Sequence, residues 1–159
     1  MVDKRPEKTP PIWEGVYQTW QEAAASAVGK GFSGQRWLDR IVQQLEDYNI
    51  DRKKYGNLAL PPRPSSLPML CSLTNPESIV DFGGSSGWVW YYLKECIVDI
   101  LVTKYNVIEN NEICQHFTNL NYHVDQPINY FTYQNFSGNC DILYTNSALH
   151  YIRDDKIFF

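Results

Sequence analysis

The feature that most constrains the fold is an alternation of short β-branched or aromatic runs with helical patterns, which starts at Ser78. Four runs predict strands, at residues 78–82, 105–109, 128–133 and 141–145. Two stretches between them predict helices, at residues 86–100 and 111–118. Strands that alternate with helices indicate a parallel sheet, because a parallel connection has to cross back over the sheet. We therefore expect an α/β fold with about four parallel strands.

Two helices are expected before this pattern. Thr19 and Glu22 have the spacing of a capping box, which predicts a helix that begins near Trp20. A second helix is expected over residues 34–48, because apolar residues there step by three or four and form one amphipathic face: Trp37, Ile41, Leu45 and Tyr48.

A proline-rich stretch separates the two parts of the chain. Residues Leu60–Pro68 read LPPRPSSLP, which forms neither a regular helix nor an inner strand. We therefore expect residues 1–75 to form an N-terminal helical cap with a Pro-rich linker. Residues 76–159 are expected to form the α/β domain.

Composition and charge exclude several classes of protein. The 159 residues carry 14 Lys and Arg against 18 Asp and Glu, a net charge of −4, which argues against a nucleic-acid partner. No apolar run approaches the roughly 20 residues of a membrane helix, and residues 1–11 lack the apolar segment of a secretory signal. The four cysteines contain no C-x-x-C pair, so no metal site is expected. We expect a cytoplasmic protein with no membrane span.

The segment that carries chemistry is Ile79–Gly87, which reads IVDFGGSSG and predicts a strand, a glycine-rich turn and a helix start. Glycine lets the main chain approach a ligand closely, and a helix N-terminus supplies N–H groups without intrahelical partners. In open α/β sheets, ligands bind beyond the carboxyl ends of the strands, where this turn would lie. The candidate binding residues here are Asp81, Gly83, Gly84, Ser85 and Gly87.

Two classes of cofactor are candidates for this turn. The dinucleotide fingerprint G-x-G-x-x-G would place Phe82 at its first glycine, which weakens the case for a nucleotide-binding oxidoreductase but leaves it as an alternative. Asp81 at the strand end, with glycine two and six positions later, instead resembles motif I of class I S-adenosylmethionine methyltransferases. That resemblance implies that Asp81 serves the methionine end of the cofactor. It also implies that Glu109, which closes the second predicted strand, binds the ribose hydroxyls.

The chain is also similar to a bacterial family of class I methyltransferases over most of its length. That family has a W-E-G-V-Y segment before a D-F-G-G-S motif, which here are Trp13–Tyr17 and Asp81–Ser85. Further segments that match are Val107–Glu109, Asp141–Leu143 and Ser147–Tyr151. The resemblance implies a Rossmann-like, S-adenosylmethionine-dependent methyltransferase in the cytosol. It also implies an acceptor that is a small molecule or a glycan precursor.

Two polar residues near the fourth predicted strand are further candidates. His150 is expected to lie where a methyl group would face its acceptor, and it is the candidate general base if that acceptor is a hydroxyl. A histidine at such a helix start also serves as a packing or cap partner, so both roles stay open. Asn146 is expected to line the same rim and to contact the cofactor.

The chain has fewer predicted strands than the sheet of the fold that the resemblance implies. The class I sheet has more strands than the four predicted before Phe159, so we expect a C-terminally truncated, incomplete sheet. The alternative from another class is therefore a truncated, non-catalytic relic or binding protein. An exposed edge at the fourth strand would favour self-association, because its N–H and C=O groups would be unpaired.

Overall fold

The computed structural model describes residues 16–26, 34–55, 66–97, 99–119 and 126–149. The chain divides into two compact units, Met1–Gly31 and Phe32–Phe159, and each is described by itself. In the first unit, helix α1 spans Trp20–Ser26. The Glu22 N–H donates to Thr19 Oγ1 at 3.2 Å, which confirms the predicted cap and the predicted start of this helix.

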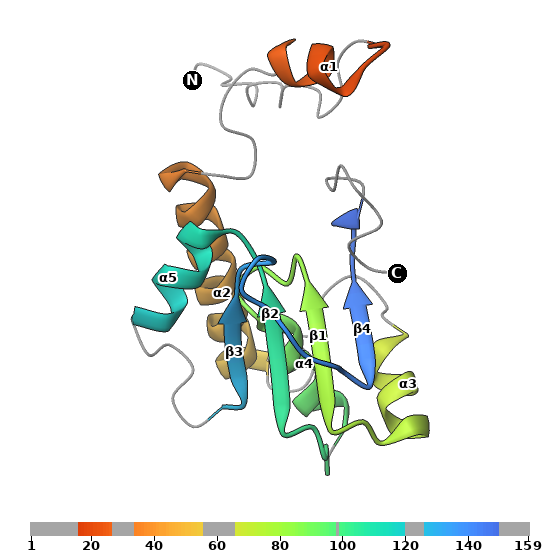
Figure 1. Ribbon diagram of the computed structural model, residues 1–159. Coiled ribbons are helices and arrows are strands. Elements are labelled where there is room, and N and C mark those ends of the chain that lie inside the picture. Colours follow the sequence, from red (N-terminus) through yellow and green to blue (C-terminus); the bar gives the residue numbers. More distant parts are fainter. Residues whose placement is uncertain (1–15, 27–33, 56–65, 98, 120–125, 150–159) are drawn as a thin grey trace, which may run out of the picture. The chain divides into compact units, whose positions relative to one another are not determined.

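The second unit is built on a four-stranded parallel sheet (Figure 1). In chain order its strands are β1 (Ser78–Phe82), β2 (Lys104–Ile108), β3 (Ile128–Phe131) and β4 (Ile142–Thr145). They lie side by side in the order β3-β2-β1-β4, and every neighbouring pair is parallel. The predicted α/β fold with four parallel strands is confirmed. This order has its switch point between β1 and β4, and ligands bind at the carboxyl ends of strands near such points.

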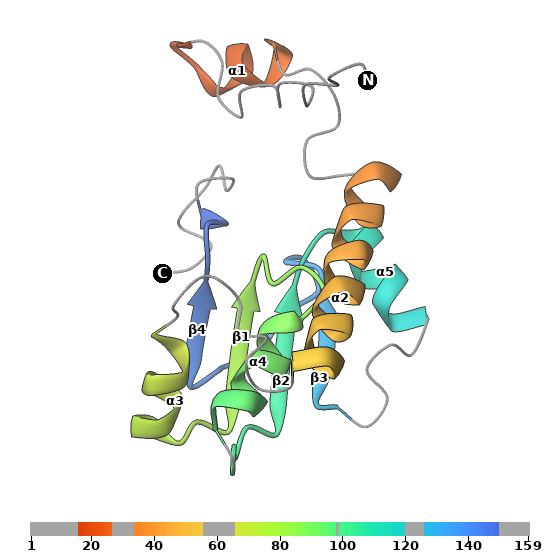
Figure 2. The same ribbon diagram turned by 180° about the vertical axis from the view of Figure 1, so that it is seen from behind.

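Helices cover one face of this sheet. α2 (Gln35–Tyr55) and α4 (Trp88–Cys96) lie over that face in Figure 2, α3 (Leu67–Thr74) precedes β1, and α5 (Asn111–Asn119) connects β2 to β3. Residues 132–141, all of which the structure describes, contain no helix and cross the opposite face from β3 to β4 (Figure 1). Within the described residues, no helix is long and apolar enough to cross a membrane.

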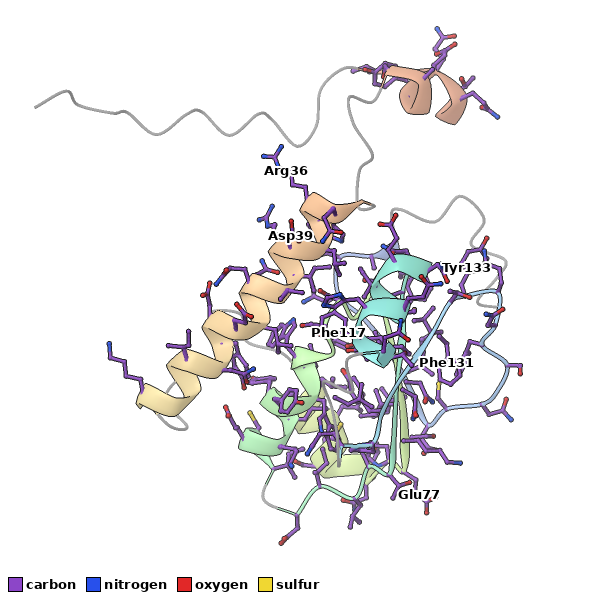
Figure 3. The ribbon with its side chains drawn as sticks, turned by 90° about the vertical axis from the view of Figure 1, so that its left-hand side faces the viewer. Arg36, Asp39, Glu77, Phe117, Phe131 and Tyr133 are labelled. Carbon is purple, nitrogen blue, oxygen red and sulfur yellow. The ribbon has the colours of Figure 1, made fainter. Side chains whose placement is uncertain are left out.

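Two apolar clusters hold the helices in place. The larger one packs α3 and α4 against the sheet, and its buried members include Leu67, Ile79, Trp90, Leu93 and Val107. The smaller one joins α2 to α5 through Ile41, Leu45, Ile113 and Phe117, and Figure 3 shows Phe117 between these two helices. The predicted apolar face of α2 is therefore buried, and it is buried against a helix of the α/β part of the chain.

Two helices differ in length from the prediction. α4 ends at Cys96 rather than at residue 100, because Ile97 is extended, with φ −129° and ψ 112°. β-branched residues such as Ile97 favour this region over the helix. α2 continues to Tyr55 rather than ending at residue 48, because residues 49–55 contain no glycine or proline that would stop it.

Candidate functional site

The glycine-rich turn between β1 and α4 has an unusual main-chain conformation. Gly83, Ser85 and Gly87 all have positive φ, of 70°, 57° and 69°. The Gly83 N–H donates to the Ile108 carbonyl at 2.9 Å, so the turn is tied to the end of β2. Ser85 has a left-handed φ, a region that L side chains rarely adopt and that favours glycine.

The glycines of this turn lie where a side chain would meet another group. A Cβ atom on Gly83 would overlap Ala148 Cβ, and one on Gly84 would lie 2.5 Å from both Cγ and Oδ2 of Asp81. A Cβ atom on Gly87 would lie 3.0 Å from the Tyr130 hydroxyl of β3. The turn is therefore packed closely against residues at or just beyond the carboxyl ends of β1, β3 and β4, and at Gly83 and Gly84 this packing leaves no room for a Cβ atom.

Asp81, in β1, lies beneath this turn. Its side chain is 1% exposed, and the Tyr105 hydroxyl of β2 donates to its Oδ2 at 2.6 Å. Burial raises the pKa of Asp81 to about 7; the Tyr105 hydrogen bond opposes this rise, and the charge of Glu109 adds to it. The carboxyl group is therefore close to the balance point between its neutral and ionised forms at neutral pH.

Glu109 directly follows β2 and lies beside the turn. Its Oε1 accepts the Ser85 N–H at 3.1 Å, and its Oε2 accepts the Asn110 N–H at 3.0 Å. Burial raises the pKa of Glu109, while these two hydrogen bonds lower it. The structure thus brings the two predicted acids and the glycine turn together at the carboxyl ends of β1 and β2. The reason is that Phe82 and Ile108 are direct partners in the β1–β2 register.

The carboxyl end of β4 lies beside the carboxyl end of β1. Thr145 pairs with Phe82 of β1, and its Oγ1 is buried with no hydrogen-bond partner among the described residues. Asn146 is exposed directly after Thr145, and its Oδ1 accepts a hydrogen bond from the Ser147 hydroxyl at 3.2 Å. His150, the predicted general base, lies outside the described residues.

Sequence reasoning missed Tyr105, Thr145 and Ala148, which contact this site or lie at its edge. The signal for Tyr105 was available in part, because it lies in the strand that Glu109 follows. Its place next to Asp81 depends on the register in which Tyr105 pairs with Ile79, two positions before Asp81 in β1. Side chains two residues apart in a strand share a face, but the register itself cannot be read from either strand alone.

A cavity of about 550 Å³ lies elsewhere, at the amino ends of β1 and β4. Residues of α3, of the segments that precede these strands and of the start of β4 line it, among them Leu70, Thr74, Glu77, Asp141 and Leu143. Figure 3 shows Glu77 at one end of the sheet and Tyr133, which follows β3, at the other. None of the predicted site residues lines this cavity.

The strand order and the turn after β1 define a Rossmann-like α/β domain. No protein-family model and no curated protein matches the chain. Among solved structures, it is similar to an SAH-bound methyltransferase from Podospora anserina, with a TM-score of 0.39 and 12% identity over 85% of this chain and 62% of that one. It is also similar to a Staphylococcus aureus protein provisionally described as a caffeoyl-CoA O-methyltransferase, with a TM-score of 0.34 and 15% identity over 66% of this chain and 52% of that one. The chain thus spans less than two thirds of either structure.

Proposed function

We propose that this domain binds S-adenosylmethionine at the carboxyl ends of β1 and β2, and that it is a methyltransferase for a small molecule or glycan precursor. The observation that carries the proposal is the hydrogen bond from the Ser85 N–H to Glu109 Oε1 at 3.1 Å. It joins the glycine turn after β1 to the acid after β2. These are the two features that the resemblance to class I methyltransferases assigns to one cofactor.

The residues present fit such a cofactor. Each Glu109 oxygen accepts one main-chain N–H, which leaves each oxygen able to accept one hydroxyl of a ribose as well. The buried Thr145 hydroxyl, which has no partner among the described residues, lies at the end of the neighbouring β4. A buried polar atom without a partner is unfavourable. The Thr145 hydroxyl therefore supports the proposal that a ligand forms a hydrogen bond with it at the carboxyl end of β4.

The chain's own part in the reaction is to bind and orient. The residues proposed to hold the cofactor are Asp81, Gly83, Gly84, Ser85, Gly87, Glu109 and Asn146. S-adenosylmethionine would supply a methyl group activated by its sulfonium. Holding the acceptor in line with that methyl group lowers the activation free energy of transfer, because the acceptor loses its translational and rotational entropy on binding and not in the reaction step. His150 is proposed as the general base for a hydroxyl acceptor.

Isothermal titration calorimetry with S-adenosylhomocysteine tests the proposal. We expect the wild-type chain to bind it, and Glu109→Ala to weaken binding by about 1–3 kcal/mol, because hydrogen bonds to a charged group are lost. The control is Glu77→Ala, which removes the same side chain at the opposite end of the sheet and is expected to bind as the wild type does.

Two results would count against this function. A sample that is folded by circular dichroism but gives no heat with S-adenosylhomocysteine would contradict it. Binding of NADH in a fluorescence titration, without binding of S-adenosylhomocysteine, would favour the oxidoreductase instead. The cytoplasmic location and the self-association through β4 stay predictions, and size-exclusion chromatography tests the second of them.

A further inference from the structure

Tyr105 and Asp81 form a buried pair beneath the proposed cofactor turn. The Tyr105 side chain is 0% exposed and that of Asp81 is 1% exposed. The distance of 2.6 Å between the Tyr105 hydroxyl and Asp81 Oδ2 lies in the range of hydrogen bonds to an ionised acceptor. The pair also joins β2 to β1, the two strands whose ends carry the proposed cofactor site.

The main chain of the turn rests directly on this pair. A Cβ atom on Gly84 would lie 2.5 Å from Cγ and Oδ2 of Asp81 and 3.0 Å from its Oδ1, so nothing separates the Gly84 backbone from the carboxyl group. A rotation of the carboxyl group would therefore displace Gly84. Because closely packed interiors transmit such shifts, the orientation of Asp81 determines the shape of the turn.

We propose that Tyr105 is a positioning residue for this turn: its hydroxyl holds the Asp81 carboxyl group under Gly84, in the orientation in which the turn binds its ligand. This inference rests on the proposed function, because the ligand concerned is the cofactor proposed above. Tyr105 acts through Asp81 and does not itself contact the cofactor.

The groups around this pair affect whether the Asp81 carboxyl group is neutral or ionised. The titratable groups that face it are Glu109 after β2, Tyr130 of β3 and Tyr144 of β4. Burial and the Glu109 charge favour the neutral form of Asp81, whereas the Tyr105 hydroxyl, as a donor, favours the ionised form. A neutral carboxyl group carries its own O–H and needs an acceptor for it. Loss of the Tyr105 hydroxyl would thus change both the charge and the hydrogen-bond geometry of Asp81.

The test measures S-adenosylhomocysteine affinity by calorimetry between about pH 5.5 and 8.5, a range that spans the pKa of Asp81. In the wild type, we expect affinity to rise with pH as Asp81 ionises. In Tyr105→Phe, we expect affinity about tenfold weaker at neutral pH and a midpoint about one pH unit higher, because the donor that favours the ionised form is lost. Tyr48→Phe, which removes a hydroxyl that donates to Glu95 Oε2 at 3.1 Å between α2 and α4, is the matched control and should keep the wild-type profile.

Each result of this test either supports or contradicts the positioning role of Tyr105. A folded Tyr105→Phe with the wild-type affinity and midpoint would overturn the role of Tyr105, and so would weaker binding with an unchanged midpoint, because a purely structural defect has that result. If Tyr105→Phe does not fold, Tyr105→3-fluorotyrosine decides, since it keeps the ring and makes the hydroxyl a stronger donor to Asp81: a midpoint below the wild-type one supports the inference, and an unchanged midpoint overturns it. Absence of binding by the folded wild type would overturn the proposed function, and this inference with it.

Discussion

The Asp141 carboxylate accepts hydrogen bonds from both the main-chain N–H and the hydroxyl of Ser78, each at 2.9 Å. The Glu77 N–H donates to the same oxygen, also at 2.9 Å. Ser78 opens β1 and Asp141 directly precedes β4, so this carboxylate joins the amino ends of two neighbouring strands. These hydrogen bonds lower the pKa of Asp141 because they favour its ionised form, and those from Ser78 have the largest effect.

We predict that Asp141→Ala lowers the midpoint temperature of unfolding at neutral pH more than Asp99→Ala, which removes an exposed carboxylate outside the sheet. Because the pKa of Asp141 is lowered in the folded state, its contribution is present at neutral pH and is lost as pH falls through that lowered value. Thermal unfolding at pH 7 and in acid should show the difference between wild type and Asp141→Ala shrinking in acid. A difference independent of pH would contradict the role of the charge.

We predict that Gly84→Ala destabilises the domain by about 1–3 kcal/mol, because its Cβ atom would overlap the buried Asp81 carboxyl group. Gly138→Ala is the control, since its Cβ atom would approach nothing nearer than Phe136 Cζ at 3.8 Å. Urea unfolding of the three proteins measures the free energies. Equal effects of the two substitutions would show that the turn yields to a side chain at Gly84.

We predict that Leu45→Ala lowers the free energy of unfolding by about 2–5 kcal/mol, because Leu45 is 1% exposed in the cluster that joins α2 to α5. Ile50→Ala, in the same helix at 60% exposure, should change it by less than about 0.5 kcal/mol. Chemical denaturation followed by circular dichroism compares them. A small effect of Leu45→Ala would mean that α2 contributes little to the stability of the α/β unit.

We predict that the wild-type domain becomes less stable as pH rises from about 4 to about 7. The folded-state pKa of Asp81 is raised from 3.8 to about 7, so the folded state binds a proton in that window that the unfolded state releases. The slope from this group is at most roughly 1.4 kcal/mol per pH unit. Asp81→Asn should flatten the dependence, whereas Glu46→Gln, on the exposed side of α2, should keep it. An Asp81→Asn profile parallel to the wild type would contradict the prediction.

Much of the fold could be predicted from local patterns. The alternation after Ser78 predicted four parallel strands, and the positions of Ile41 and Leu45 predicted the buried face of α2. The ends of elements were less accurate: α4 stops at Cys96 although the apolar spacing continues to residue 100. Ile97 and Ile100 still pack on the core from the segment that follows the helix, so apolar spacing alone does not show where a helix ends.

The turn after β1 and the acid after β2 could be predicted from the order of residues alone, because glycines and a carboxylate at strand ends are local features. How these residues meet follows from the packing of the strands against one another. The register of β1 against β2 places the Tyr105 hydroxyl on Asp81 and the Ser85 N–H on Glu109. A shift of one residue would turn every side chain of one strand to the other face and remove the first contact. That register depends on the whole packed sheet and its helices.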